Sequence, residues 1–384
     1  MRKVVIVSAV RTPVGKKGGA LRDFKRPELA GMAMKEALRR VNMDGTEIDD
    51  VIFGGIGAVE YRGPARHFWL EAGLPIQVPG LTINRACSTS LTGIALAAAQ
   101  IMAGFGDTYL VGGVEMDSRP SYVLVNDFPY KAGQPVVSTG YFSPQAFGNE
   151  PMTKTAENVA QRFGITRKEC DEYALRSYEL AEKGYEEGLY PEHVIPIKLP
   201  GAEARTMVRD EVLRKTSTEQ LSALKPVLGG VVTAGNASPL NDGAGAAVVM
   251  LEEKARAMGL TPLLRFVDYS VVGVDPRIMG IGPVPAMKRL LCRNKMSIGD
   301  LDFIECNEAF AVQTLAVSRE LGIEMDRLNI RGGAIALGHP GSATGVSLVA
   351  KASGLMKRIQ ADRCAITFCN GGGMGVAVMF ENCT

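Results

Sequence analysis

A cysteine at a strand-to-helix turn is the first residue in this sequence that could do covalent chemistry. Cys87 follows a short expected strand, residues 81–84, and precedes an alanine-rich apolar stretch, residues 88–104, that is typical of a buried helix. The hydroxyl residues 88–90 open this helix, where they can satisfy unpaired backbone N–H groups. The positive end of the helix dipole is expected to lower the pKa of the thiol and to favour the nucleophilic thiolate. The segment alone does not exclude that Cys87 is a small core residue, the usual role of a free cysteine.

His339, one of three histidines, could activate such a thiol. It lies in a glycine-dense turn, residues 332–345, just before a second apolar helix, and its place in the second half of the chain corresponds to that of Cys87 in the first. A histidine beside a cysteine is a common way to generate a thiolate at neutral pH. The alternative is a turn histidine that only caps the helix.

A second cysteine opens a loop with four glycines among its seven residues. This loop, 369–375, directly follows an expected strand at residues 365–368. So many glycines indicate unusual backbone angles or close approach by another group. Cys369 could be an acid/base thiol, and the loop N–H groups could form an oxyanion hole. The alternatives are a simple glycine-rich turn and a phosphate-binding loop, although no Lys-Ser/Thr pair follows.

Two further polar segments indicate a cleft. Asn307 and Glu308 lie between apolar residues, where polar groups would be destabilising if they were buried without partners. They are therefore expected to face a cleft, and Asn307 could hold a catalytic water there; helix capping is the alternative. The turn of small polar residues at 235–244 is suited to lining a narrow channel.

The elements that would position these groups alternate along the chain. Helices are expected at residues 27–41 and 88–104, and apolar strands at residues 4–9, 50–55, 81–84, 109–113, 246–251 and 365–368. Strands alternating with helices predict a mostly parallel α/β sheet. Such proteins build their sites where strands end and helices begin, which is where the segments above lie.

The chain has an insertion and an internal repeat. Residues 118–233 hold many prolines and charges, no clear run of buried strands and an amphipathic helix near residues 167–187, which indicates an inserted loop domain. Residues 81–113 resemble residues 328–368 in their order of strand, glycine-bearing helix and strand. Two similar halves packed back to back would place equivalent loops around one cleft. The expected units are residues 1–117 plus 234–262, residues 118–233, and residues 263–384.

Composition and charge exclude several classes of function. The formal net charge is +2 and no dense Lys/Arg block occurs, so nucleic acid is not an expected partner. Seven scattered cysteines without paired spacing favour neither a disulfide framework nor a metal site, and they indicate a reducing, cytoplasmic setting. The N-terminus is typical of a buried strand rather than a signal peptide, and no apolar run approaches the ~20 residues of a membrane span.

The other cysteines and His193 are expected to have no chemical role. His193 is expected in a surface loop. Packing roles are expected for Cys170, Cys292, Cys306 and Cys364, while Cys383 is terminal.

Taken together and in this order, the motifs resemble the thiolase family, which comprises acetyl-CoA acetyltransferases and 3-oxoacyl-CoA thiolases. The match runs along nearly the whole chain, and although each motif is unspecific, their shared order is specific. The motifs are Arg11–Pro13, Asn84–Cys87, Met152–Glu157, Gly235–Ser238 with Asn241–Gly243, Asp275–Pro276 with Met279–Pro283, Asn307–Phe310, Gly338–Pro340 and Cys369–Gly371.

The resemblance implies a five-layer α-β-α-β-α fold of two similar halves, with a loop domain inserted in the first. It also implies a homodimer or homotetramer, coenzyme A (CoA) as a substrate, and no permanently bound metal or redox cofactor. Cys87, activated by His339, would attack a 3-oxoacyl-CoA, and Cys369 would protonate the departing acetyl-CoA carbanion. CoA would then take the acyl group, and the reverse sequence is a Claisen condensation. One oxyanion hole would comprise His339 and a water on Asn307, and the other the backbone N–H groups of Cys87 and Gly371.

The resemblance further implies where CoA is held and where this chain departs from the family. The expected substrate and CoA contacts are Ser238, Ala234, Phe310, Met152 and, near the nucleotide phosphate, Arg214. The departures are residues 88–90 after the nucleophile, Ser342 at a family glycine, Pro151 in place of a substrate-contacting histidine, Ser143 and Leu228 near the CoA arm, and the aromatic-rich residues 63–69. Because the catalytic set is intact and the pocket wall is changed, we expect an acyl group other than acetyl. It would be branched, aromatic or carboxylated, as in the degradation of fatty acids or aromatic compounds.

Other functions stay open at the level of the sequence. An acetoacetyl-CoA-forming biosynthetic thiolase would share the catalytic set. A decarboxylating ketosynthase would share the fold but would need a second histidine in place of the Cys369 loop, and His67 and His193 lie in unlike contexts. The chain could also be a non-catalytic scaffold, or a subunit that is active only with a small accessory protein.

Overall fold

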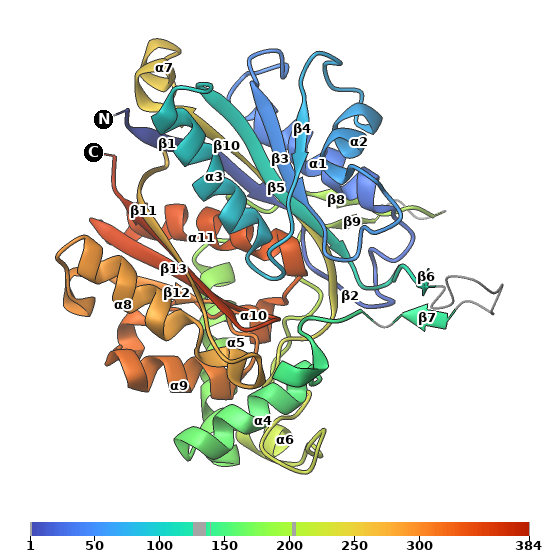
Figure 1. Ribbon diagram of the computed structural model, residues 1–384, viewed down its shortest axis with the longest axis vertical. Helices are drawn as coiled ribbons and strands as arrows, with labels where there is room; N and C mark the ends of the chain where they lie inside the picture. Colours follow the sequence, from blue (N-terminus) through green and yellow to red (C-terminus); the bar gives the residue numbers. More distant parts are fainter. Residues whose placement is uncertain (1, 126–135, 139, 202–204, 384) are drawn as a thin grey trace.

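Two groups of strands, one from each half of the chain, form the centre of the molecule (Figure 1). The computed structural model describes residues 2–125, 136–138, 140–201 and 205–383, and ten strands of these residues form one sheet. The N-terminal group runs in the order β4 (Gly80–Thr82), β3 (Asp50–Gly54), β5 (Thr108–Met116), β10 (Asn241–Leu251) and β1 (Val4–Arg11), and β2 (Gly15–Lys16) pairs with β10. The C-terminal group runs in the order β11 (Leu264–Gly273), β14 (Met374–Glu381), β13 (Arg363–Asn370) and β12 (Phe303–Cys306). The two groups join where residues 5 and 6 of β1 pair with residues 265 and 264 of β11.

Strand directions are mixed, so the expectation of a mostly parallel sheet is wrong. β3 is parallel to β4 and β5, and β12 is parallel to β13. β10 runs antiparallel to β1 and β5, and β14 runs antiparallel to β11 and β13. The connections give the reason: helices α2 (Pro64–Glu71) and α3 (Thr89–Ala103) allow parallel crossovers, whereas the short turn 371–373 between β13 and β14 forces the chain to reverse.

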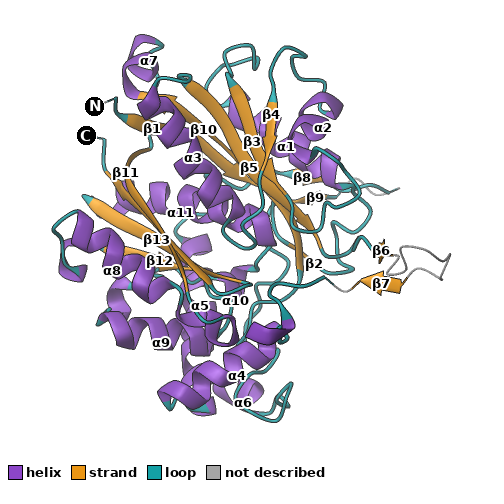
Figure 2. Cartoon of the chain, in the orientation of Figure 1, coloured by secondary structure: helices purple, strands orange, loops and turns teal. Residues whose placement is uncertain are grey.

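Helices and strands alternate in five layers (Figure 1, Figure 2). α1 (Arg26–Arg39) and α2 pack on the N-terminal strands, and α8 (Pro283–Arg293) packs on the C-terminal strands. Between the two groups lie α3 and α11 (Thr344–Ile359), each of which contacts strands of both. This arrangement confirms the expected α-β-α-β-α fold. Further helices are α7 (Glu252–Ala257), α9 (Ala311–Leu321), α10 (Ala334–Leu337) and the short 3-10 helices η2 (Pro276–Ile281), η3 (Ile298–Asp300), η4 (Met325–Arg327) and η5 (Gly341–Ala343).

The central helix α3 owes its apolar composition to its position. By length and composition alone, the window 86–103 would be able to cross a membrane, so the expectation that no run has this length is wrong. In the fold, 67% of the window is buried. Leu91, Ile94 and Ala98 have no exposed surface at all. Coverage by strands on both sides accounts for a helix that is apolar all round.

The two halves contain the same contact, in which an aspartate carboxylate accepts hydrogen bonds from two backbone N–H groups. In the first half, the carboxylate of Asp49 accepts hydrogen bonds from the N–H groups of residues 107 and 108, at 2.7 and 2.9 Å. In the second half, Asp302 accepts from residues 362 and 363, at 2.8 and 2.9 Å. Each carboxylate thereby ties a strand to its parallel neighbour, β3 to β5 and β12 to β13. The repeated contact supports the internal repeat read from the sequence.

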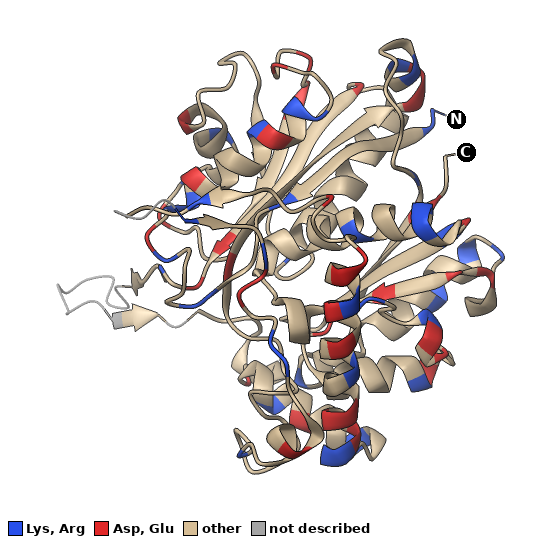
Figure 3. Cartoon of the chain, turned by 180° about the vertical axis from the view of Figure 1, so that it is seen from behind, with Lys and Arg blue, Asp and Glu red and all other residues tan. Residues whose placement is uncertain are grey.

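A long segment separates β5 from β10. In its described residues it contains β6 (Val123–Val125), β7 (Val136–Ser138), η1 (Gln145–Phe147), α4 (Met152–Phe163), α5 (Arg167–Glu186), β8 (Ile197–Lys198), β9 (Thr206–Met207) and α6 (Thr218–Ser222). Acidic and basic residues are interspersed along α5, as on the rest of this face (Figure 3). The unit boundaries 1–117 plus 234–262, 118–233 and 263–384 stay a prediction.

Candidate active site

The turn that carries Cys87 is held by neighbouring side chains. Asn84 accepts a hydrogen bond from the N–H of Ala86 at 2.9 Å. The hydroxyl of Thr89 accepts from the N–H of Arg85 at 2.9 Å and donates to the carbonyl of Ala86 at 2.7 Å. Ala86 has a φ of 47°, a left-handed conformation that destabilises a residue with a Cβ by about 1–2 kcal/mol. Strain held in this way is typical of a functional position, and here it presents Cys87 at the start of α3.

The thiol of Cys87 is protonated at rest. Burial raises its pKa to about 11, although the backbone N–H groups of Cys87 and Gly371 act in the opposite direction and lower it. The helix dipole was expected to lower this pKa, so desolvation outweighs the dipole here. The side chain is partly exposed and therefore reachable. Cys87 thus needs a base before it can act as a nucleophile.

Residues 88–90 tie α3 to the C-terminal half, whereas the sequence predicts that they cap the helix. The side chain of Ser88 makes no capping bond, and its N–H donates to Oδ1 of Asn370 at 2.8 Å. The hydroxyl of Ser90 accepts from the N–H of Val346 in α11 at 3.1 Å. The start of the nucleophile's helix is therefore bonded to two segments of the other half.

Helices α3 and α11 touch at a glycine. A Cβ added to Gly345 would lie 2.3 Å from the backbone nitrogen of Leu91, so only glycine allows this approach. Cys87 stands just before α3, and His339 stands a few residues before α11. The contact between the helix ends therefore brings both turns to the same end of the helix pair.

His339 is held by three polar contacts. Its backbone N–H donates to Oδ1 of Asn241 at 2.8 Å. Its Nδ1 lies 2.7 Å from the hydroxyl of Thr344, and its Nε2 lies 3.4 Å from Nδ2 of Asn307. Burial lowers the pKa of the imidazole from 6.5 to about 4. The ring is therefore neutral at pH 7 and can accept a proton.

Asn307 presents an amide oxygen that is free to bind water. The residue directly follows β12, and its N–H donates to the carbonyl of Thr367 at 2.9 Å. Its Oδ1 is buried and has no hydrogen-bond partner among the described residues. A buried polar atom of this kind is where an ordered water is expected. The predicted role of Asn307 as holder of a catalytic water is compatible with this geometry.

Cys369 lies at the end of β13 and is almost completely buried. Burial raises the pKa of its thiol well above the ordinary value, and interactions with Cys87 and Cys306 raise it further. The hydrogen bond from Ser88 to Asn370 joins the residues that follow the two candidate catalytic thiols in the chain. Gly372 and Gly373 have φ of 86° and 77°, so the unusual backbone angles predicted for this loop are present.

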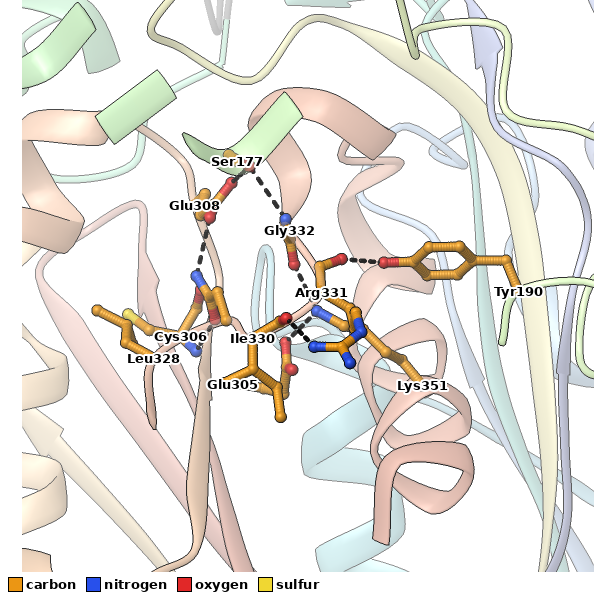
Figure 4. Close-up of polar contacts among 12 residues, drawn as sticks. Ser177, Tyr190, Glu305, Cys306, Glu308, Leu328, Ile330, Arg331, Gly332 and Lys351 are labelled. Carbon is orange, nitrogen blue, oxygen red and sulfur yellow. Dashed lines mark hydrogen bonds and ion pairs between the residues drawn. The ribbon is translucent and has the colours of Figure 1, made fainter. Parts of the chain in front are cut away.

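Glu308 is fully buried, although it was expected to face a cleft. Its carboxylate accepts hydrogen bonds from the hydroxyls of Tyr173 (2.8 Å) and Ser177 (2.7 Å), from Nδ2 of Asn329 (2.9 Å) and from the N–H of Ile335 (3.1 Å). Figure 4 shows Glu308 between Ser177 and the segment that leads to His339. Because its lone pairs are used in this way, Glu308 anchors α5 to that segment rather than lining a cleft.

A buried ion pair lies beside the same segment (Figure 4). Nζ of Lys351 lies 2.7 Å from Oε2 of Glu305, and their side chains are 2% and 0% exposed. The ammonium also donates to the carbonyl of Gly332, and the hydroxyl of Tyr190 donates to the carbonyl of Arg331. These bonds fix the start of the His339 turn on α11 and β12.

His193 is buried, so its expected place in a surface loop is wrong. Its carbonyl accepts a hydrogen bond from the N–H of Arg11 at 3.0 Å, which draws this segment onto the end of β1. Its ring lies 5.8 Å from the ring of Tyr190. With Thr344 and Lys351, His193 lines a cavity of about 30 Å³ behind the His339 turn.

The remaining cysteines have free thiols. Cys170, Cys306 and Cys364 are buried, as expected for packing residues, whereas Cys292 is exposed and Cys383 is partly exposed. His67 lies on α2, with Nε2 2.9 Å from Glu71. Among the described residues, no group of three or more His, Cys, Asp or Glu side chains is arranged to hold a metal ion.

Two expected CoA contacts lie side by side. The N–H of Ser238 donates to the carbonyl of Ala309 at 3.0 Å, and Ala237 forms an antiparallel bridge with Phe310. This pairing places the turn that also carries the exposed Ala234 next to the segment of Asn307. Met152 begins α4 and is partly buried. The binding roles of these residues stay predictions.

Arg214 lies in different surroundings. Its guanidinium is 5.7 Å from the ring of Tyr178 on α5. The surface groove around it is lined by carboxylates and by two lysines: Glu179, Glu182, Lys183, Glu186 and Lys215. The groove therefore carries charges of both signs, and the proposed phosphate contact stays a prediction.

Three residues position the site without having been assigned a role from the sequence. Thr344 contacts Nδ1 of His339, Asn241 holds the His339 backbone, and Asn370 bonds the start of α3. A hydroxyl close after the histidine in a glycine-rich turn is the signal that could have identified Thr344. The other two bonds join segments far apart in the chain, and local sequence does not reveal them.

Comparisons with known proteins agree along the whole chain. The family model described as the thiolase N-terminal domain matches residues 4–253, and the thiolase C-terminal domain matches residues 260–382. An acetyl-CoA acetyltransferase of Cupriavidus necator is 41% identical over 393 residues, which covers 99% of this chain and 100% of the relative. A 3-oxoadipyl-CoA/3-oxo-5,6-dehydrosuberyl-CoA thiolase of Escherichia coli is also 41% identical, over 399 residues, with the same coverage of 99% and 100%.

Solved structures share the fold. The crystal structure of human mitochondrial 3-ketoacyl-CoA thiolase superposes with a TM-score of 0.93 at 38% identity and covers 100% of this chain and 99% of its own. The same human protein in complex with CoA gives a TM-score of 0.91 at 38% identity, with coverage of 99% and 98%.

Proposed function

Because this chain belongs to the thiolase family of acyltransferases, we propose that it moves acyl groups between 3-oxoacyl-CoA and CoA through a thioester on Cys87. Thiolase activity and the use of CoA as a substrate follow from the family and from the CoA complex of a human relative. The assignment of steps to residues rests on the geometry of this chain.

In cleavage, the proton of Cys87 passes to Nε2 of His339 as the sulfur attacks the substrate. With the Nδ1–H of His339 donating to Thr344, Nε2 keeps the lone pair that receives this proton. The sulfur attacks the ketone carbon of the 3-oxoacyl-CoA, and the N–H groups of Cys87 and Gly371, which act to lower the pKa of this thiol, bind the oxyanion that forms beside it. Each such donor typically lowers the barrier by about 3–4 kcal/mol.

The bond between C2 and C3 then breaks. Its electron pair goes to the acetyl-CoA enolate, whose oxygen is bound by protonated His339 and by a water on Asn307, and Cys369 gives its proton to the enolate carbon. The resulting Cys369 thiolate takes the proton of an incoming CoA thiol. The CoA sulfur attacks the acyl group on Cys87, and the released sulfur recovers its proton from His339. Two thiols are needed because one carries the acyl group while the other moves protons.

The observation that carries this proposal is the hydrogen bond from the N–H of Ser88, the residue after Cys87, to Oδ1 of Asn370, the residue between Cys369 and Gly371, at 2.8 Å. It places the loop of Cys369, from one half, on the nucleophile of the other half. Mixing the enzyme with a 3-oxoacyl-CoA in the absence of CoA should add the mass of one acyl group to the intact protein, and Cys87→Ser should abolish the gain. Cys292→Ser, which changes an exposed thiol, is the control and should acylate like the wild type. An unchanged wild-type mass, or an acyl group on another cysteine, would contradict the proposal.

We further propose that the preferred acyl group is larger than acetyl. The relatives leave this open, because an acetyl-CoA acetyltransferase and a 3-oxoadipyl-CoA thiolase are equally similar. Two departures from the family act away from the acyl group: the hydroxyl of Ser90 accepts a hydrogen bond from Val346 in the other half, and Ser342 donates to Glu115 at 2.9 Å. Pro151 and Ser143, in the insertion, are departures on the side of the substrate. Fastest turnover of acetoacetyl-CoA would instead support the biosynthetic alternative.

Assembly and location stay at the level of prediction. A homodimer or homotetramer, a cytoplasmic setting and the optional need for a small accessory subunit are all expectations from the sequence. Activity of the purified single chain would exclude an obligatory accessory subunit.

A further inference from the structure

A phenylalanine from the insertion lies directly on the catalytic glycine loop. A Cβ added to Gly371 would be 2.6 Å from Cδ1 and 2.7 Å from Cε1 of Phe142, so the aromatic ring packs against the backbone of Gly371 itself. A Cβ added to Gly372 would be 2.8 Å from the carbonyl oxygen of Phe142. The ring and backbone of Phe142 therefore cover the loop that is hydrogen-bonded, through Asn370, to the residue after Cys87.

The segment that carries Phe142 is fixed by polar contacts. The N–H of Phe142 donates to Oδ1 of Asn149 at 3.1 Å, and the buried Ser143 donates to the carbonyl of Gly148 at 2.5 Å. These two bonds close residues 142–149 into a compact turn just ahead of α4. The ring is thus held on the loop before any substrate binds, which is the preorganisation that a selective site requires.

The ring also keeps an open face. Phe142 is 50% exposed although one side is covered by the glycine loop. An apolar surface held next to a reacting atom favours an apolar ligand, because contact removes both surfaces from water. Aromatic side chains give such contacts a large area and a defined geometry.

The group that reaches this ring is the acyl chain. During acyl transfer the carbonyl oxygen is bound by the N–H of Gly371, and Phe142 packs on the same residue. Ser143, the residue after Phe142, is expected near the pantetheine arm of CoA, whose other expected contacts lie at Ser238 and Phe310. The pantetheine arm leaves after each half-reaction, however, whereas the acyl chain stays on Cys87 between them.

We propose that Phe142 is a specificity-determining residue whose ring forms an apolar wall for the acyl chain, so that the enzyme favours 3-oxoacyl-CoA esters with aliphatic chains of several carbons or aromatic groups over acetoacetyl-CoA. This inference rests on the proposed thiolase function and names the substrate class of that site.

The test compares Phe142→Ala with wild type in thiolysis of acetoacetyl-CoA, 3-oxooctanoyl-CoA and 3-oxo-3-phenylpropionyl-CoA. Loss of the wall should lower kcat/KM about tenfold or more for the two larger substrates and less than about threefold for acetoacetyl-CoA, as for other apolar pockets. Phe142→Leu should retain most of the activity on the aliphatic substrate. Phe147→Ala is the matched control, because Phe147 is 64% exposed on the same turn and should leave all three values unchanged.

A competition experiment gives a second readout. With equal concentrations of acetoacetyl-CoA and 3-oxooctanoyl-CoA, the intact mass of the wild type should show mainly hexanoyl on Cys87, and Phe142→Ala should shift the adduct toward acetyl. An equal loss for all substrates, or a raised KM for CoA with unchanged acyl preference, would overturn the assignment to the acyl chain. No turnover and no adduct with any thioester in the wild type would instead refute the proposed function, and this inference with it.

Discussion

At the scale of residues, the two groups that are proposed to start the reaction, Cys87 and His339, are both uncharged at rest. A thiol with a pKa of about 11 does not give its proton to an imidazole with a pKa of about 4 without help. The proton therefore moves as the sulfur attacks the substrate and as the oxyanion hole takes up the developing charge. A stable thiolate–imidazolium pair, as the sequence suggested, is not the resting state.

The raised pKa of Cys87 predicts its reaction with alkylating agents. Only the thiolate reacts, and a pKa above that of an ordinary cysteine leaves less thiolate at pH 7. We expect alkylation of Cys87 by iodoacetamide to be slow at pH 7 and to accelerate steadily up to pH 10. Peptide mass spectrometry can follow it, with the exposed Cys292 as an internal reference. Faster labelling of Cys87 than of Cys292 at pH 7 would show that a thiolate is already present.

The contact between Thr344 and Nδ1 of His339 predicts a positioning role for the hydroxyl. In Thr344→Val the imidazole loses the partner that fixes its tautomer, so we expect kcat to fall by about 10- to 100-fold with little change in KM for CoA. Steady-state kinetics over a range of pH should also show a displaced acid limb.

Ser347→Ala is the matched control for this variant. Ser347 lies one turn along α11 and lines the same cavity, but its hydroxyl bonds only the carbonyl of Ala343 among the contacts described, at 3.1 Å. An equal loss of activity in the two variants would indicate damage to the helix rather than loss of the imidazole contact.

The sequence indicated the residues that are proposed to react but not the residues that hold them in place. Cys87, His339 and Cys369 are chemically distinctive types in glycine-rich or helix-start contexts, so they could be selected from the sequence. Asn370 and Phe142 act across the fold on residues far away in the chain, and no local pattern indicates such contacts. His193 was misplaced because its polar, proline-flanked segment is drawn inward by pairing with β1.

At the scale of elements, α11 supports the site through its first turn and through a side chain in its middle. Its first turn meets α3 at Gly345, and Lys351 in its middle holds the carbonyl of Gly332 and the carboxylate of Glu305. The helix therefore fixes the start and the end of the turn that carries His339. The limits of strands and helices were predictable within a few residues, but strand direction was not, because β10 follows a long insertion.

Removing the buried ammonium should strongly destabilise the protein. Lys351→Met leaves Glu305 buried without its counter-charge, and we expect the free energy of unfolding to fall by about 3–5 kcal/mol. Urea unfolding followed by circular dichroism measures the change. Adding Glu305→Gln to this variant removes the unpaired charge and should recover much of the loss. If the double variant is no more stable than Lys351→Met, the stability of the pair does not arise from its charges.

At the scale of the whole molecule, a repeated unit has been used for two different tasks. Both halves keep the same closing carboxylate, at Asp49 and Asp302, but one supplies the nucleophile and the other the base and the second thiol. The internal repeat could be read from the sequence because its strands and helix recur in order. How the halves join could not be read, since residues 5 and 6 of β1 and the contact at Gly345 depend on the folded shapes of both.

The meeting of α3 and α11 at Gly345 has a consequence for how the enzyme fails. Neither half holds a complete set of the groups that are proposed to react. Activity therefore requires the contact between the two halves. A slight separation of the two helices at this contact would move the sulfur away from the imidazole while the strands and helices stayed folded. Inactivation by mild heat or denaturant should therefore precede any visible loss of secondary structure.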